Sequence, residues 1–315
     1  MPTPNEDLIK RADMALSDLT ANGGLLNPEQ SNAFIDLVME QPTILKQVRS
    51  IRMKGPESKI NKIGFANRIM AAASQTGGAE DDGSNGRYLA KAKRAAPTTN
   101  KIVLNTSEMI AEVRLPYEVL EDNIEGQSLE SHIMRLIAER AAIDLEEFAL
   151  AGDTASLDTY LALQDGYLKR MTSNVVNNGS AGIGPDMFED GLLAMPQKYL
   201  RNLGQLRNFV SVGNTIKYRS RVAQRATGYG DSMLTGQQPI YAFGVPVDAA
   251  PMLATVGAGD QGILTFPQNL LFGIQRDIRV ETDKDIRSRE YIIVLTARVA
   301  LGIEDEEATV KYTNI

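Results

Sequence analysis

The stretch from residue 50 to residue 115 begins and ends with an alternation of apolar and charged positions. At its start, Ile51 and Met53 alternate with Arg52 and Lys54. A longer alternation closes the stretch, with apolar residues at Met109, Ala111, Val113 and Leu115. A period of two predicts β-strands with one buried face. We therefore expect two strands that are separated by a long connection.

The connection is too polar to form a core of its own. Residues 74–87 (SQTGGAEDDGSNGR) contain four glycines and three acids, and no apolar side chain larger than alanine. Burial of so little apolar surface does not offset the entropy that ordering would cost. The segment is therefore either a disordered loop or an arm that becomes ordered by lying on another molecule.

Charge in this connection changes sign along the chain. Three acids are followed by a basic patch that has only Tyr88 for stacking on bases, so a nucleic-acid site here would be short. Opposite charges close together suit docking onto a neighbouring copy of the chain. The expected contact residues are Gly77, Gly78, Glu80, Asp81, Asp82, Arg87, Lys91, Lys93 and Arg94.

Residues 128–150 have the spacing of a long amphipathic helix. Ser128 is a candidate N-cap, and Gly152 follows the expected end. About 22 residues at a rise of 1.5 Å each span roughly 33 Å, enough to run the length of a domain. The expected apolar stripe consists of Leu129, Ile133, Leu136, Ile137, Ala141, Leu145 and Phe148.

Shorter elements are predicted on both sides of this helix. Upstream, residues 5–20 have helical spacing, and a second short helix is expected from Asn27 to just before Pro42. Both are too short to be stable alone, so we interpret them as an extended N-terminal arm. Downstream, a short hairpin is expected around Val175 and Val176.

A further helix is predicted by the capping-box pattern of Asp186 and Glu189. It is expected to run to about residue 202, with an interruption at Pro196. A short buried strand is expected at residues 209–212.

The C-terminal third is predicted to change from helix to strand. Asn214 is expected to cap a helix that ends near Gln224, and three glycines then predict a mobile loop. After Gly244 the chain has strand and turn patterns. Residues 291–301 are apolar on both faces, which predicts a central strand. Helices and antiparallel strands are interleaved without a βαβ rhythm, so the expected fold class is α+β.

Composition excludes several kinds of chemistry. The formal charge is −7, from 33 basic and 40 acidic residues, which argues against a dedicated DNA-binding surface. The chain has no cysteine, no tryptophan and one histidine, His132. Disulfides, thiolate metal sites and cysteine nucleophiles are therefore excluded.

The first ten residues lack a signal-peptide pattern and no apolar stretch is long enough to span a membrane, so synthesis in a cytoplasm is expected.

The remaining motifs are weak as chemistry. Gly257–Gly262 matches GxGxxG, but strand-like residues follow it, which favours a turn over a dinucleotide site. The acidic runs Glu304–Glu307 and Asp81–Asp82 lack the spacing of a calcium loop and are interpreted as solvated surface. His132 has no cysteine partner and there is no GxSxG, so we expect a structural or surface role. No catalytic residue, cofactor or metal site is predicted.

The order of these elements resembles that of the major capsid proteins of tailed bacteriophages, which share the Hong Kong 97-type fold. The shared features are an N-terminal arm, a long extended hairpin (the E-loop) and a long spine helix. Four segments are similar to the family's later elements: AMPQKYLRNLGQLRNFVSVGNTIKYRSR (194–221), LTGQQPIYAFGVPVDAAPML (234–253), TFPQNLLFGIQRDIRVETDKD (265–285) and YIIVLTARVALGIEDEEATVKYT (291–313).

The resemblance implies a division of the chain. Its parts would be an N-terminal arm (1–50), the E-loop (51–115), a peripheral domain with the spine helix (116–200), an axial domain (201–275) and return strands of the peripheral domain (276–315). A loop containing Gly228, Tyr229, Gly230 and Asp231 would point toward the capsomer axis.

The resemblance also implies partners and a location. Copies would form the hexamers and pentamers of an icosahedral shell, a virion component assembled in the host cytoplasm around weakly contacted double-stranded DNA. A portal protein at one vertex and a decoration protein are further partners, with no membrane. About 50 residues precede the E-loop, which suggests a separate scaffolding protein. Lys59, Lys62 and Asn67 carry no cross-linking motif, so no covalent cross-link is expected.

Two other functions remain open at this point. One is an encapsulin, a related shell protein that encloses an enzyme. The other is a hydrolase with a long lid loop, which predicts a monomer with carboxylates clustered in a cleft. Closed shells in the electron microscope would favour a shell protein, and a catalytically active monomer would favour the hydrolase.

Overall fold

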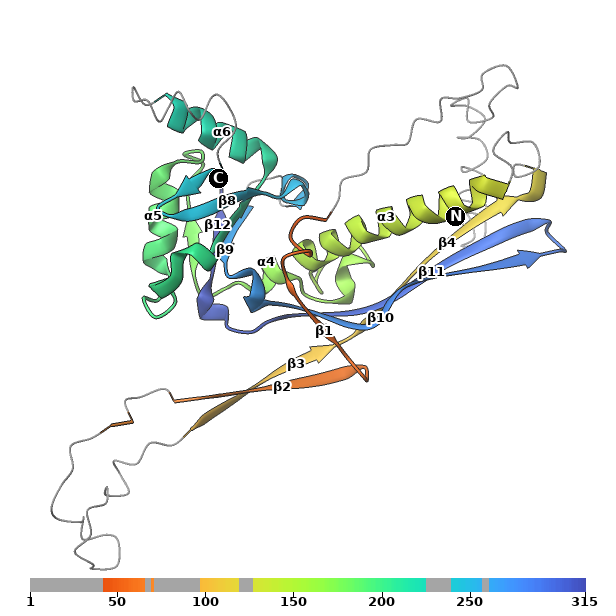
Figure 1. Ribbon diagram of the computed structural model, residues 1–315, viewed down its shortest axis with the longest axis horizontal. Helices are drawn as coiled ribbons and strands as arrows, with labels where there is room; N and C mark the ends of the chain where they lie inside the picture. The colour runs from red at the N-terminus through yellow and green to blue at the C-terminus, as the bar shows by residue number, and fades with distance from the viewer. Residues whose placement is uncertain (1–41, 66–68, 71–96, 119–126, 225–238, 257–260) are drawn as a thin grey trace, which may run out of the picture.

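The computed structural model describes residues 42–65, 69–70, 97–118, 127–224, 239–256 and 261–315. Within these ranges the chain forms two lobes and one projecting hairpin (Figure 1). Helices and mainly antiparallel sheets are both present, which confirms the expected α+β class. The helices predicted at residues 5–20 and from Asn27, and the loop expected after Gln224, lie outside the described residues.

The first lobe consists of a four-stranded sheet and a long helix. The strand order is β1 (Arg49–Arg52), β10 (Leu270–Asp285), β11 (Glu290–Ile303) and β4 (Ser107–Pro116). β1 is parallel to β10, and the other neighbours are antiparallel. β11 lies between two long partners, which confirms the prediction of a central strand at residues 291–301.

The long helix α3 (Gln127–Ala151) confirms the prediction for residues 128–150 to within one residue at each end. It runs along the four-stranded sheet (Figure 1). Near its start, Ile133 and Ile137 pack against a small buried cluster around Tyr291. Near its end, Leu145 and Phe148 lie in the largest buried cluster. The apolar stripe therefore joins two separate parts of the core.

The second lobe is built on a six-stranded sheet. Its strands, in order, are β5 (Val175–Asn177), β12 (Thr309–Thr313), β9 (Gln261–Thr265), β6 (Arg207–Val210), β8 (Val245–Ala249) and β7 (Tyr241–Ala242). α5 (Pro185–Ala194) and α6 (Val212–Ala223) pack on it. Phe188 makes edge-to-face contacts with Tyr218 and Tyr312, with ring centroids 4.9 and 6.0 Å away. β12 thus belongs to a different sheet from β10 and β11.

Short helical turns connect these elements. They are η2 (Leu161–Leu163), α4 (Tyr167–Arg170), η3 (Leu200–Gln205), η4 (Pro251–Ala254), η6 (Pro267–Asn269) and η7 (Glu306–Ala308).

The hairpin is a separate two-stranded sheet of β2 (Glu57–Gly64) and β3 (Thr98–Asn105). It projects away from both lobes, and its two strands are antiparallel (Figure 1). Pairing runs from Glu57 opposite Asn105 at the root to Gly64 opposite Thr98.

This hairpin corrects the strands expected within residues 50–115. The alternation around Ile51 belongs to β1, and that from Met109 to Leu115 belongs to β4. These two strands do not pair with each other: β1 lies beside β10 and β4 beside β11. The hairpin strands are instead β2 and β3, which lie between them in the sequence. The partners β10 and β11 are more than 150 residues away, and local periodicity carries no information about them.

Three local predictions in the second lobe were wrong. The side chain of Ser211, not Asn214, caps α6, and its hydroxyl accepts from the Asn214 amide at 3.3 Å. α5 begins after Gly184 without a side-chain cap, so Asp186 and Glu189 form no capping box. The helix also ends at Ala194, before Pro196, and does not continue to residue 202.

The strand predictions in the second lobe were partly correct. The strand expected at residues 209–212 is β6, two residues earlier. Val175 and Val176 form a single strand parallel to β12, not a hairpin. In both cases the partner strand is remote in sequence, so the pairing that decides the boundaries was not visible locally.

Candidate functional site: the projecting hairpin and its attachment

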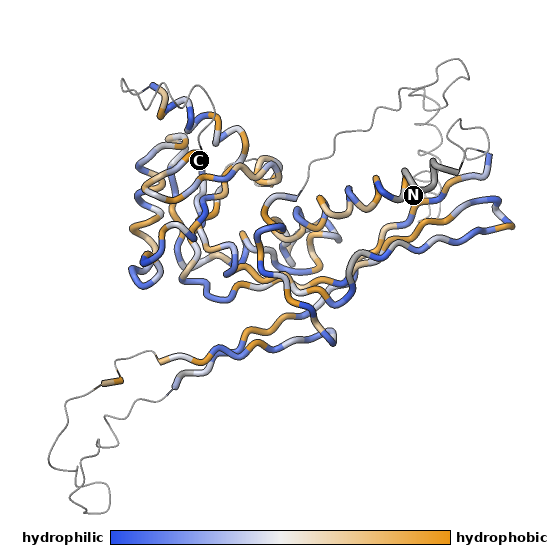
Figure 2. Tube along the Cα trace, viewed as in Figure 1, coloured by the Kyte–Doolittle hydropathy of each residue, from blue (hydrophilic) through white to orange (hydrophobic). Residues whose placement is uncertain are grey.

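The far end of the described hairpin exposes large apolar side chains. Ile63 and Phe65 are 69% and 53% exposed, and Ile69 and Met70 are 51% and 83% exposed. Figure 2 shows apolar positions continuing along the hairpin away from the body. Four such residues within an eight-residue stretch are unusual for a surface that stays in water. This part of the hairpin therefore has the properties of an interaction surface.

The root of the hairpin is attached to the first lobe by a small apolar cluster. Met53, Leu104, Leu271 and Ala300 are buried there, and Ile60 and Ile102 of the hairpin pack against them. The Thr106 amide donates to the Pro56 carbonyl at 2.9 Å, and its hydroxyl lies 3.2 Å from the Gln275 side-chain oxygen. The root is therefore held by buried contacts, whereas the far end is not.

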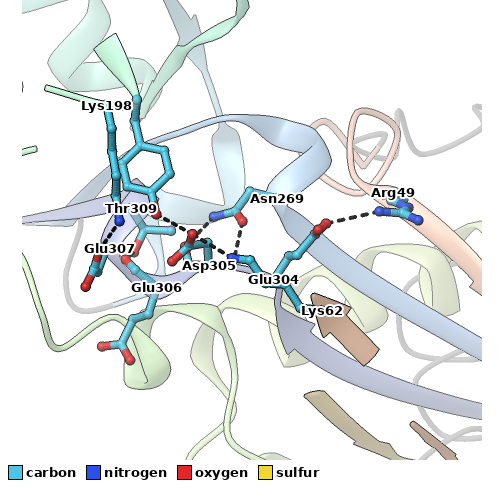
Figure 3. Close-up of polar contacts among 10 residues, drawn as sticks. Arg49, Lys62, Lys198, Asn269, Glu304, Asp305, Glu306, Glu307 and Thr309 are labelled. Carbon is cyan, nitrogen blue, oxygen red and sulfur yellow. Dashed lines mark hydrogen bonds and ion pairs between the residues drawn. The ribbon is translucent and has the colours of Figure 1, made fainter. Parts of the chain in front are cut away.

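A second attachment lies at the acidic run that follows β11 (Figure 3). Glu304 pairs with Arg49 of β1 at 3.0 Å. The Asp305 carboxylate oxygen Oδ2 accepts from Lys62 Nζ of β2 at 2.7 Å and from the Tyr199 hydroxyl. The hairpin is thus tied to the body by a charged contact beyond its root.

The next two acids bind other segments. Glu306 Oε1 accepts from the Thr172 hydroxyl at 2.6 Å and from the amides of Thr172 and Ser173 at 2.9 Å each. These bonds, led by that of the hydroxyl, lower the pKa of Glu306 below its usual value. Glu307 pairs with Lys198. Four consecutive carboxylates therefore bind four different parts of the chain.

The prediction of a solvated acidic surface needs correction at this run. The Asp305 side chain is 26% exposed, and each of the four carboxylates has a partner from a remote segment. The partners are absent from the local sequence, which is why the run looked like a solvated face. Among the described residues, no group of three or more potential ligands could hold a metal ion.

Replacing Asp305 with asparagine is expected to lower the melting temperature near neutral pH, with a difference that fades in acid. Partial burial acts to raise the pKa of Asp305, but the bonds from Lys62 and Tyr199 outweigh it and lower the pKa below 3.8. The folded state therefore favours the ionised carboxylate above pH 3.8, and this stabilisation is lost as the pH falls through the lowered folded value. Thermal unfolding of both proteins across this range measures the effect; an equal difference at every pH would contradict it.

A third attachment holds the first described residues to the long helix. Glu146 of α3 is 3% exposed. Its carboxylate accepts from the Thr43 amide at 2.9 and 3.0 Å and from the Ile44 amide at 2.6 Å. Bonds to an ionised acceptor are shorter and stronger than neutral ones. Glu146 therefore fixes the point where the chain leaves the segment 1–41.

The residues predicted for contact with a neighbouring copy lie outside the described part of the chain. These are Gly77, Gly78, Glu80, Asp81, Asp82, Arg87, Lys91, Lys93 and Arg94. The same holds for the axis-loop residues Gly228, Tyr229, Gly230 and Asp231. Their assignments stay predictions.

Other sequence candidates lie in described elements. His132 is in α3, although its side chain is not among those described. Gly262 lies in β9, so the GxGxxG motif leads into a strand and lacks the helix that a dinucleotide site needs. Lys59 pairs with Glu57, and Lys62 pairs with Asp305. No helix in the described ranges is long and apolar enough to cross a membrane.

The comparisons with known proteins agree with this architecture. No family model matches the chain. A Bacillus subtilis (strain 168) protein, "Putative prophage capsid protein YqbE", is 41% identical over 319 residues, covering 99% of both chains. Among solved structures, the capsid of a native GTA particle aligns with a TM-score of 0.66, 16% identity and coverage of 94% of this chain and 97% of the other.

Two further phage structures give a similar result. A chain of Microbacterium phage Oxtober96 aligns with a TM-score of 0.64 at 14% identity, covering 94% of this chain and 98% of the other. The capsid of Myoviridae phage XM1 aligns with a TM-score of 0.63 at 12% identity, covering 92% and 97%. These alignments confirm the Hong Kong 97-type fold. With a capsid relative matched along its whole length and this fold, the chain belongs to the phage major capsid proteins.

Proposed function

We propose that this protein builds an icosahedral phage shell, in which its copies form hexamers and pentamers that enclose double-stranded DNA. The observation that carries the proposal is the projecting hairpin, because its far end exposes large apolar side chains that no described residue buries. A neighbouring copy would cover it. The role is structural, and the protein would be a component of the virion.

Each part of the structure can be assigned to an element of the capsid fold. We assign the hairpin as the E-loop, α3 as the spine helix and the four-stranded sheet as the peripheral domain. We assign the second lobe as the axial domain, with the loop at Gly228–Asp231 toward the capsomer axis. This lobe also includes β5, α5 and β12, which the expected division at 201–275 placed in the peripheral domain. We assign residues 1–50 as the N-terminal arm, whose last two residues enter the four-stranded sheet as the start of β1.

Assembly then follows from geometry. Each copy lends its E-loop to one neighbour and receives the E-loop of another, so the contacts are heterologous and close into a ring. Individually weak contacts add up around the shell through multivalency. The net charge of −7 suits a shell that does not bind its packaged genome tightly. A portal protein, a separate scaffolding protein and a decoration protein are the further partners we expect, with assembly in the host cytoplasm and no covalent cross-link.

Replacing Ile63 and Phe65 with serine is expected to abolish shell formation while the subunit stays folded. Burial of each such side chain contributes about 1.5–3 kcal/mol. Loss of both therefore weakens every copy of the contact by roughly two to four powers of ten in affinity. Sedimentation velocity and electron microscopy measure assembly, and circular dichroism checks the fold.

The matched control replaces both residues with leucine, which keeps the surface apolar. This variant is expected to form shells. Shells from the serine variant in the same yield as from the unaltered protein would show that this surface has no role in assembly. A protein that stays monomeric without any substitution, under conditions that keep it folded, would contradict the proposed function itself.

A further inference from the structure

We propose that Asp305 is the positioning residue that sets the angle of the hairpin against the body. It does so through one oxygen, which accepts both from Lys62 of the hairpin and from Tyr199 of the second lobe. The consequence for assembly rests on the proposed function. The positioning itself is a property of the single chain.

The place of Lys62 on the hairpin makes this contact effective. Lys62 lies opposite Asn100, five residues along β2 from the root pair at Glu57. At about 3.3 Å per residue, the contact is roughly 17 Å from the root. A bond at that distance opposes rotation of the hairpin with a long lever arm. The apolar cluster at the root reaches only as far as Ile60 and Ile102, so the ion pair lies two residues farther out along β2.

Asp305 is a rigid partner for this contact. The Asn269 side chain binds both backbone groups of Asp305: its amide nitrogen donates to the Asp305 carbonyl at 2.8 Å, and its oxygen accepts from the Asp305 amide at 2.8 Å. Asn269 is itself buried. The Thr309 hydroxyl donates to the Glu306 carbonyl at 2.7 Å and closes the next turn. The acceptor is therefore fixed, whereas its donor is the end of a flexible lysine.

The ion pair between Lys62 and Asp305 is weak enough to break and re-form. The side chains of Lys62 and Asp305 are 40% and 26% exposed. Partly exposed ion pairs are weak, because water screens them and ordering a long side chain costs entropy. When Lys62 leaves, Asp305 keeps its bond from Tyr199. The pair therefore holds one hairpin angle without locking it.

Tyr199 extends the contact to the second lobe. It lies in the turn between α5 and η3, and the neighbouring Lys198 pairs with Glu307. Because Lys62 and Tyr199 share one oxygen of Asp305, a shift of either changes the position at which the other binds. The angle of the hairpin and the position of this turn are thereby coupled, and such coupling is reciprocal.

Spin-label distance measurements test this proposal directly. The chain has no cysteine, so Thr99→Cys on β3 and Glu189→Cys on α5 provide a unique pair of labels on exposed positions. Labelled protein is diluted into a large excess of unlabelled protein, so that only distances within one chain are measured. The unaltered background is expected to give one narrow distance distribution. Lys62→Met is expected to shift and broaden it.

The matched control is Lys59→Met, on the same strand. It removes the same charge, but Lys59 pairs with Glu57 within the hairpin and not with the body. This control is expected to keep the narrow distribution, and Tyr199→Phe to shift it in the same direction as Lys62→Met but less. A Lys62→Met distribution that matches the unaltered protein, or an equal change in the Lys59→Met control, would overturn the proposal.

Electron microscopy of the same samples separates this proposal from the proposed function. If shells form and the Lys62→Met distribution is unchanged, the positioning role fails and the shell function stands. If the distribution changes but the unaltered protein never forms shells, the positioning role stands and the shell function fails.

Discussion

Replacing Gly152 with alanine is expected to destabilise the subunit by about 3 kcal/mol, the upper end of the usual cost of overpacking. Gly152 directly follows α3, and a Cβ atom there would lie 2.3 Å from the Gln164 carbonyl oxygen and 2.8 Å from that of Phe148. Both are backbone atoms, so no side-chain rotation relieves the clash. The helix end or the returning loop would have to move.

The close approach between Gly152 and the Gln164–Gly166 segment lets the chain turn back at the end of α3. The Gly166 amide donates to the Gly152 carbonyl at 2.8 Å, and the Asp153 amide donates to the Leu161 carbonyl at 2.9 Å. These bonds return the chain onto the end of α3 before it enters the second lobe. The alanine variant is therefore also expected to loosen the connection between the lobes.

The matched control is Gly213→Ala in α6. A Cβ atom there meets nothing within 4 Å, and the position is helical. This variant is expected to be neutral or to stabilise the protein by up to about 1 kcal/mol, because alanine favours the helix over glycine. Denaturant unfolding of the three proteins measures the difference. Equal midpoints for Gly152→Ala and Gly213→Ala would contradict the structural argument.

Replacing Glu146 with alanine is expected to cost about 1–3 kcal/mol for the buried Ile44 amide that loses its acceptor, with a smaller cost at the half-buried Thr43 amide, and to free the segment that begins at Thr43. The amides of Thr43 and Ile44 both donate to this carboxylate. Hydrogen exchange at these two amides is expected to rise steeply in the variant. Glu146→Gln keeps an acceptor of similar size and is expected to show a smaller change in the same direction.

Glu139→Ala on the same helix is the control for this prediction. Glu139 forms an exposed pair with Arg135 at 3.1 Å, four residues apart. Such pairs contribute about 0.3–0.5 kcal/mol, so stability and the exchange of Thr43 are expected to change little. Unchanged exchange at Thr43 and Ile44 in Glu146→Ala would show that the segment is held by other contacts.

Helix α3 and strand β11 show what local sequence can predict. Helix α3 was predicted to within one residue at each end, because its apolar stripe and the glycine after its end are both local signals. The long strand β11 was predicted to be central because its residues are apolar on both faces. In each case the element's own side chains carried the information.

The attachments of the hairpin were not predicted. Lys62 and Asp305 are 243 residues apart, and Thr43 and Glu146 are 103 apart. A lysine in a strand and an acid in an acidic run each have an ordinary solvated interpretation, and nothing nearby indicates a partner. Glu146 and Glu147 both lie between the apolar residues Leu145 and Phe148, and the local sequence does not show which of the two carboxylates is buried.

The sequence alone thus determined the α+β class and the long helix. It also carried the resemblance to the capsid family, because the order of elements is a property of the chain. Only the tertiary structure decided that β2 and β3 form the hairpin, that β1 and β4 join remote strands, and that Asp305 binds the hairpin. The physical reason is that periodicity reports which face of an element is buried, whereas pairing depends on contacts between segments far apart in sequence.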